Sequence, residues 1–142
     1  MATAQLQVVK KLEDLIAKMV DYIEKIHKTV LVQLNSSSFD NFIKNTPVAI
    51  VLFAAHWCKP CTALLPIYEK IALRLSNRKG VKFGLVDVDR EPAIADRYGI
   101  NDIPAILVYV QGNVVDAIIG LHKVDDIEKR LEKIVNMYSE SR

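Results

Sequence analysis

An unbroken apolar run at positions 48–53 leads almost directly into the two cysteines of the chain, Cys58 and Cys61. A run of this kind is typical of a strand that is buried on both faces. The residues after the cysteines, 62–78, have the apolar spacing of a helix. The cysteines are therefore expected at a strand-to-helix corner, where the free N–H groups and the dipole of the helix favour negative charge. This position predicts a lowered pKa for the Cys58 thiol and a reactive thiolate.

Composition and charge exclude several classes of protein. With 142 residues, 51% of them hydrophobic and 25% charged, the chain is long enough for one globular domain with its own core. The net charge is only +2 and the two signs are interspersed, which argues against nucleic-acid binding. No apolar run approaches the length of a membrane span, and the N-terminus lacks the regions of a signal peptide. We therefore expect a cytoplasmic protein that does not bind membranes.

The spacing of the two cysteines favours a reactive disulfide over one that stabilises the fold. A bridge that closes so short a loop removes only about 2 kcal/mol of unfolded-state entropy, so it is better suited to being made and broken. His56 could add a third ligand for a metal, but there is no second C-x-x-C motif to complete a tetrahedral site. We expect no metal and no other cofactor within one chain, while a metal shared by the cysteines of two chains remains an alternative.

The first 28 residues form a separate amphipathic pattern. From about residue 3 to residue 28 the sequence is helical in character, and apolar residues recur at alternating steps of three and four. We call this set the apolar stripe; it comprises Val9, Leu12, Ile16, Met19, Ile23, Ile26 and Val30. We expect the stripe to pack on the helix's own domain, with dimerisation or docking to a partner as the alternative.

The remaining sequence alternates between strands and helices. Strands are predicted at 29–34, 48–53, 81–88, 105–110 and 114–119, and helices at about 39–43, 62–78, 89–98 and 124–138. Two strand–helix–strand crossovers require parallel pairing, whereas the turn at Gly112 joins two antiparallel strands. The pattern predicts an α/β fold with a mixed five-stranded sheet and helices on both of its faces.

Several motifs together resemble the thioredoxin family. They are the W-C-K-P-C segment from Trp57 to Cys61, the helix-interior Pro66, the pair Ile103–Pro104 and Gly120 after the hairpin. The resemblance covers roughly residues 29–138. It implies a thioredoxin-like domain at 29–142, preceded by the N-terminal helix, residues 1–28, as an extension.

The resemblance also implies a function in thiol–disulfide exchange. Cys58 attacks a disulfide of a target protein, and Cys61 then resolves the mixed disulfide. A thioredoxin reductase supplies the electrons, so the protein would take part in electron transport and cell redox homeostasis. The Ile103–Pro104 peptide bond is implied to be cis. The residues implied to line the target-binding surface are Trp57, Lys59, Pro60, Ile103, Pro104 and Gly120.

The sequence departs from the family at three positions. Lys59 replaces the usual glycine between the cysteines, and a cation there favours the thiolate and a more oxidising disulfide. Leu52 and Leu85 stand where thioredoxins usually have a buried aspartate and a lysine that move the proton of the resolving cysteine. His56 is the candidate acid or base nearby, although an exposed loop histidine is the plainer interpretation and water could take the role.

These features leave three functions open. The first is a protein disulfide reductase, and the second is an oxidase or isomerase of the same fold, which Lys59 favours. The third is an assembly or binding protein that uses residues 1–28, for example as a homodimer.

Overall fold

A computed structural model describes residues 2–139 of the chain. The side chains of residues 2 and 25–29 lie outside the description, and with them Ile26 of the apolar stripe; so does the end of the predicted domain, residues 140–142.

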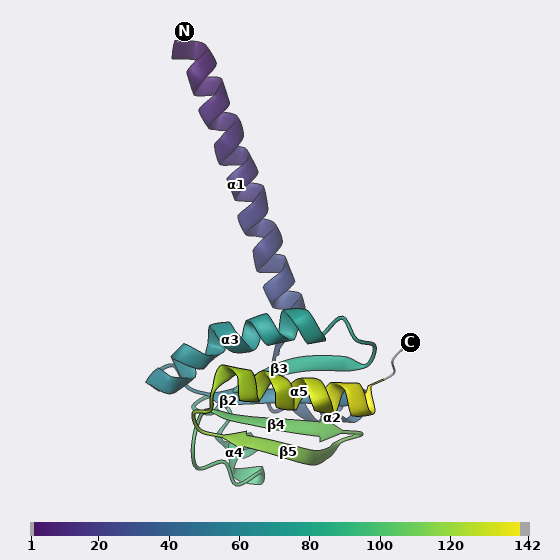
Figure 1. The fold of residues 1–142 in the computed structure, drawn as a ribbon. Helices are drawn as coiled ribbons and strands as arrows, with labels where there is room; N and C mark the ends of the chain where they lie inside the picture. Colours follow the sequence, from purple (N-terminus) through teal and green to yellow (C-terminus); the bar gives the residue numbers. More distant parts are fainter. Residues whose placement is uncertain (1, 140–142) are drawn as a thin grey trace.

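A mixed sheet of five strands forms the centre of the fold (Figure 1). Its order is β1-β3-β2-β4-β5, with β1 and β2 parallel to β3, β4 antiparallel to β2, and β5 antiparallel to β4. This confirms the predicted mixed sheet. The strands are β1 (Leu31–Gln33), β2 (Val48–Ala54), β3 (Val81–Asp87), β4 (Ala105–Val110) and β5 (Asn113–Ile119).

Helices cover both faces of this sheet, as predicted. One face packs against α3 (Lys59–Leu75) and α5 (Val124–Tyr138), whose buried residues include Tyr68 and Leu131. The other face packs against α2 (Phe39–Asn45) and α4 (Pro92–Arg97) through residues such as Phe39. The central strand β2 is buried along nearly its whole length, because both of its faces lie under helices.

The long N-terminal helix α1 (Ala2–Val30) projects away from the rest of the molecule (Figure 1). Between Leu6 and Ile23 its large apolar side chains are 47–67% exposed. The expectation that the apolar stripe packs on its own domain is therefore wrong for these residues. Among the residues of α1 whose side chains are described, Val30 at the base of the helix packs against the core on the α3 side.

Several boundaries differ from the sequence prediction; α3, for example, spans Lys59–Leu75 where a helix was predicted at 62–78. Residues 29 and 30 continue α1, so β1 is shorter than the predicted strand at 29–34. The predicted helix at 89–98 begins only at Pro92. Asp89 therefore lies before the helix and Glu91 is its N-cap residue. Asp89 accepts a hydrogen bond from Trp57, and Glu91 accepts hydrogen bonds from the backbone and hydroxyl of Ser36.

Tyr68 ties the helix layer to the sheet. Its hydroxyl lies 3.0 Å from the carbonyl oxygen of Ile50 and 2.8 Å from that of Gly84, so it donates to one of them at a time. Burial raises the pKa of Tyr68 well above its usual value. The hydroxyl therefore remains a donor, and α3 is held over the junction of β2 and β3.

Candidate active site

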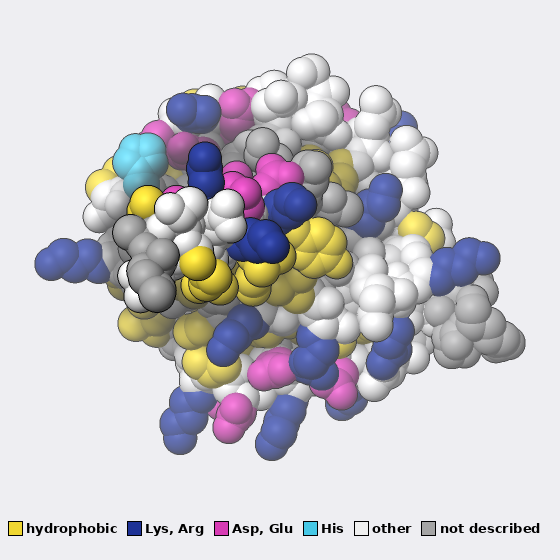
Figure 2. All heavy atoms as spheres, turned by 90° about the horizontal axis from the view of Figure 1, so that it is seen from above, with side chains coloured by type: hydrophobic (Ala, Val, Ile, Leu, Met, Phe, Trp, Pro, Cys, Tyr) yellow, Lys and Arg dark blue, Asp and Glu magenta, His cyan; other side chains and the backbone are white. Residues whose placement is uncertain are grey.

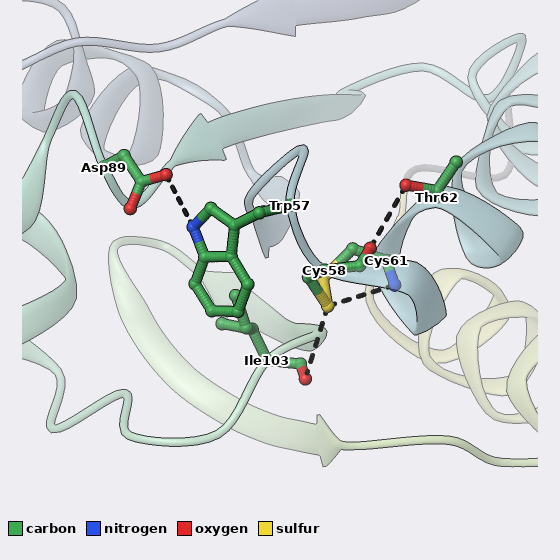
Figure 3. Close-up of a disulfide and its surroundings, with 6 residues drawn as sticks. All are labelled: Trp57, Cys58, Cys61, Thr62, Asp89 and Ile103. Carbon is green, nitrogen blue, oxygen red and sulfur yellow. Dashed lines mark hydrogen bonds between the residues drawn. A yellow bond between two sulfur atoms is a disulfide. The ribbon is translucent and has the colours of Figure 1, made fainter.

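The cysteines lie where β2 gives way to α3. Cys58 is the N-cap of α3, and its sulfur accepts a hydrogen bond from the backbone N–H of Cys61 at 3.3 Å (Figure 3). Pro60 occupies the first turn, where a missing N–H costs nothing. The carbonyl oxygen of Cys58 accepts from the backbone and the hydroxyl of Thr62, each at 3.1 Å. The predicted corner is thus present, with the sulfur of Cys58 at the positive end of the helix.

Cys58 and Cys61 form a disulfide, with their Cα atoms 5.2 Å apart. Cys61 is 2% exposed and Cys58 only 6%, so neither cysteine lies open at the surface. Both cysteines belong to a small buried cluster with Ala55, against which Ile103 packs. Cys58 has the larger exposed fraction of the two.

Ile103 packs against the cysteines from the loop before β4, and Pro104 follows it in the chain. Their peptide bond is cis, as the family resemblance implied. The sulfur of Cys58 lies 3.9 Å from the carbonyl oxygen of Ile103 (Figure 3). Behind them, the backbone N–H of Gly120 donates to the carbonyl oxygen of Pro104 at 2.8 Å. The end of β5 thereby holds the loop in place beside Cys58.

Trp57 lies on the surface next to the disulfide. It is 65% exposed, which excludes a core role, and its indole Nε1 donates to Oδ2 of Asp89 at 2.7 Å (Figure 3). Lys59 is exposed and Pro60 is partly buried. The structure thus brings Trp57, Lys59, Pro60, Ile103, Pro104 and Gly120 to the same end of the sheet.

His56 and Asp87 lie near Cys61, on the lining of one cavity. His56 Nδ1 is 4.0 Å from Oδ2 of Asp87; the histidine side chain is 83% exposed and the aspartate 18%. Both line a cavity of about 350 Å³ together with Cys61, Leu85 and Arg90. Within residues 2–139 no group of three or more His, Cys, Asp or Glu side chains could hold a metal ion.

Comparisons with known proteins agree with this geometry. The family model "Thioredoxin" matches residues 30–133. The chain belongs to the thioredoxin family. It is 32% identical to thioredoxin of Chlamydia caviae over 106 residues, which are 75% of this chain and 96% of that protein. The protein is therefore a thiol–disulfide oxidoreductase.

Solved thioredoxin structures share the fold. Thioredoxin from Trypanosoma brucei brucei matches with a TM-score of 0.67 at 24% identity, covering 75% of this chain and 91% of that one. Plasmodium falciparum thioredoxin matches with a TM-score of 0.62 at 28% identity, covering 76% and 97%. The family model begins at residue 30, so nearly all of α1 lies outside the match.

This thioredoxin lacks the usual polar pair beneath the cysteines. Leu52 and Leu85 are directly paired between the parallel strands β2 and β3. Leu52 is fully buried, and both leucines pack with the core on the α3 side of the sheet. The two sequence positions are therefore filled by apolar contact, and any proton acceptor must come from elsewhere.

Sequence reasoning missed two acidic residues of the site, Asp87 and Asp89. Asp87 ends β3, and Asp89 follows it in the turn. A usable signal was present, because the carboxyl ends of parallel neighbouring strands meet at one edge of a sheet. Since β2 delivers the cysteines to that edge, acids at the end of β3 had to lie close to them.

Proposed function

We propose that this thioredoxin reduces target disulfides with Cys58 as the nucleophile and Cys61 as the resolving cysteine. The Cys58 thiolate attacks one sulfur of the target disulfide, and that bond breaks to release a first target thiolate. Cys61 then loses its proton and attacks Cys58, which releases the second target thiolate. The target gains two electrons and two protons, and the two cysteines become a disulfide.

The N-cap position of Cys58 is the observation that supports these roles. Its sulfur accepts the N–H of Cys61 and stands at the positive end of α3, so negative charge on Cys58 is stabilised. Cys61 lies deeper and cannot reach an incoming target before Cys58 does. This difference supports attack by Cys58 and resolution by Cys61.

We also propose the surface on which the target lies. Trp57 provides an exposed aromatic wall on one side of Cys58, and the Ile103–Pro104 loop provides the other side. An extended target segment fits between them, with the backbone of Ile103 as a pairing partner. Lys59, Pro60 and Gly120 complete the rim of this surface.

A reducing role implies an electron donor and a compartment. We propose a thioredoxin reductase as the donor and the cytoplasm as the location. Both cysteines of the chain are in the active site, so no cysteine is assigned to a structural disulfide of the kind that secreted proteins carry.

Redox equilibration tests reductase against oxidase. The protein would be equilibrated with thiol–disulfide buffers beside a known reducing thioredoxin, and the oxidised fraction read by thiol labelling. A potential close to that of the reference supports the reductase. A potential higher by about 60 mV supports the oxidase or isomerase and gives Lys59 causal weight. Cys61→Ser should trap targets on Cys58, whereas Cys58→Ser should trap none.

A second proposal concerns α1, whose exposed apolar face favours a homodimer. In the apolar stripe the first seam position holds Val9, Ile16, Ile23 and Val30, all β-branched, and the second holds Leu12, Met19 and Ile26. β-branched residues at the first position with leucine at the second favour two parallel helices, and two of the three second-position residues are not β-branched. At 29 residues α1 is about 43 Å long, enough for several heptads of contact.

The charges near α1 are consistent with pairing to a second copy. Seen from the free end of the helix, Lys and Arg side chains are spread around the molecule with Asp and Glu between them, and they form no single basic patch on this face (Figure 2). An anionic membrane surface would favour such a patch. Within residues 2–139 no helix has the length and apolar character needed to span a bilayer.

Sedimentation tests the homodimer. The full chain should sediment as a dimer, and a chain without residues 1–28 should sediment as a folded monomer that retains its exchange activity. A full chain that remains monomeric would overturn the proposal, and so would a truncated chain that remains dimeric.

A further inference from the structure

Resolution of the mixed disulfide requires Cys61 to lose a proton inside the protein. Cys61 is 2% exposed and packs against Ala55 and Ile103, and such apolar surroundings disfavour a thiolate. The attacking species is nevertheless the thiolate. A base near Cys61 would therefore raise the rate of this step, and the positions that usually provide one are Leu52 and Leu85.

Asp87 lies two residues beyond Leu85 on β3. Successive side chains of a strand alternate between its faces, so Asp87 is on the same face as Leu85, the one that α3 covers. In the parallel pairing it is opposite Ala54, the last residue of β2 before the loop that carries Cys58. Compared with the side chain of Leu85, the Asp87 carboxylate thus lies further along the strand toward the cysteines, at the edge of the sheet where they lie.

A cavity connects this carboxylate with Cys61. Cys61, Leu85 and Asp87 all line the same space of about 350 Å³, which is large enough for several water molecules. Its mouth is bordered by His56 and Arg90. A water molecule in this space could hydrogen-bond to both the thiol and the carboxylate, which is the arrangement that general-base catalysis through one water requires.

The other ionisable groups that face Asp87 fit the role less well. Arg90, whose Nε is 3.9 Å from Oδ2 of Asp87, is a permanent cation and accepts no proton. His56 is 83% exposed, with Nδ1 4.0 Å from the same oxygen, so its ring is largely in solvent. Oδ1 of Asp87 accepts the N–H of Asp89, which leaves Oδ2 as the oxygen available to the cavity.

We propose that Asp87 is the proton acceptor for Cys61, acting through water in this cavity; the inference rests on the proposed roles of the two cysteines. The proton of the Cys61 thiol passes by way of water to the Asp87 carboxylate. The resulting thiolate attacks the sulfur of Cys58, the bond between Cys58 and the target breaks, and the electron pair leaves with the target sulfur. Asp87 returns the proton to solvent past His56.

The test separates the two chemical steps with a thionitrobenzoate disulfide as the target. In the reduced full-length protein, attack by Cys58 releases the first coloured thiolate and attack by Cys61 releases the second. Asp87→Asn retains the shape of the side chain and an acceptor for Asp89, but it removes the base. We expect the second release to slow by about tenfold or more near neutral pH. The difference in this rate between Asp87→Asn and the unmodified protein should become smaller as the pH rises, because hydroxide then removes the proton of Cys61.

Three further variants complete the test. Asp96→Asn removes an exposed acid of α4 far from the cavity and should leave both releases unchanged. Asp87→Glu should recover part of the lost rate. Should Asp87→Asn not fold, Asp87→Ala with added formate replaces it, with the rate expected to rise with formate concentration.

Two outcomes overturn the proposal. One is a second release within twofold of the unmodified protein over the whole pH range. The other is a faster second release near neutral pH, which would mean that Asp87 only repels the thiolate through its charge. Failure of the underlying cysteine roles has a different signature, since Cys61→Ser would then give no stable mixed disulfide on Cys58.

Discussion

Leu52 and Leu85 face each other across the parallel junction of β2 and β3, in the layer beneath the disulfide. Their contact replaces a charged pair with apolar packing, and it leaves no ionisable group at either position. An ionisable group that assists the thiol chemistry must therefore lie elsewhere, and Asp87 and His56 line the cavity next to Cys61.

Introducing the family's acid at this site should destabilise the protein. In Leu52→Asp a carboxyl group replaces a fully buried leucine, so the free energy of unfolding should fall by about 3 kcal/mol or more. Burial raises the pKa of the new carboxyl, so the loss should grow as the pH rises above about 4. Urea unfolding between pH 4 and pH 8 measures this. Adding Leu85→Lys should recover part of the loss, and Leu52→Asn should show no such pH dependence.

Gly120 should resist substitution because of its backbone. Its φ is +78°, and a Cβ there would meet nothing within 4 Å, so the cost of Gly120→Ala is conformational and about 1–2 kcal/mol. Gly99→Ala is a matched control, with φ +63° and similar open space. Urea midpoints should fall in both variants. Only Gly120→Ala should also slow reduction of a protein disulfide, because Gly120 holds Pro104; equal rates in the two variants would contradict this.

Tyr68 should make stability fall in alkaline solution. Its folded-state pKa is raised by burial, so its contribution is complete below about pH 10 and declines as the pH rises above that value. Each such group lowers the free energy of unfolding by about 1.4 kcal/mol per pH unit in this range. Burial raises the pKa of Tyr109 as well, with the same sign. In Tyr68→Phe the free energy of unfolding should be lower by about 1 kcal/mol at pH 7. Above pH 10 it should fall less with each pH unit than in the unmodified protein, as measured by denaturant titrations at several pH values.

A single charge in the apolar stripe should separate the proposed homodimer. Ile16 is 59% exposed in the single chain, so Ile16→Asp should leave the domain's stability unchanged. In a dimer it would place two carboxylates in an apolar seam, and dissociation should become at least a hundredfold easier. Sedimentation equilibrium measures this. Ala17→Asp adds the same charge beside the stripe and should remain dimeric; equal behaviour of the two variants would contradict the parallel pairing.

The sequence by itself was sufficient for the strands, the sheet type and the cysteine corner. A strand with the apolar run at 48–53 is buried only if layers cover both of its faces. The cysteines that follow it come before a helical pattern and therefore lie at a helix N-terminus. The W-C-K-P-C segment and Ile103–Pro104 indicated the family, and the family implied the cis bond. These residue types serve thiol–disulfide exchange at the site of the two cysteines.

Only the tertiary structure decided what surrounds the cysteines and what α1 touches. Asp87 falls in the strand predicted at 81–88 and Asp89 in the helix predicted at 89–98. Their partners, His56 and Trp57, come from a loop more than thirty residues earlier. The helical pattern of α1 shows which face is apolar, but not which surface it meets, since spacing along a helix carries no information about its partner. That face is exposed because α1 projects away from the domain where it leads into β1. Local propensities do not specify this direction.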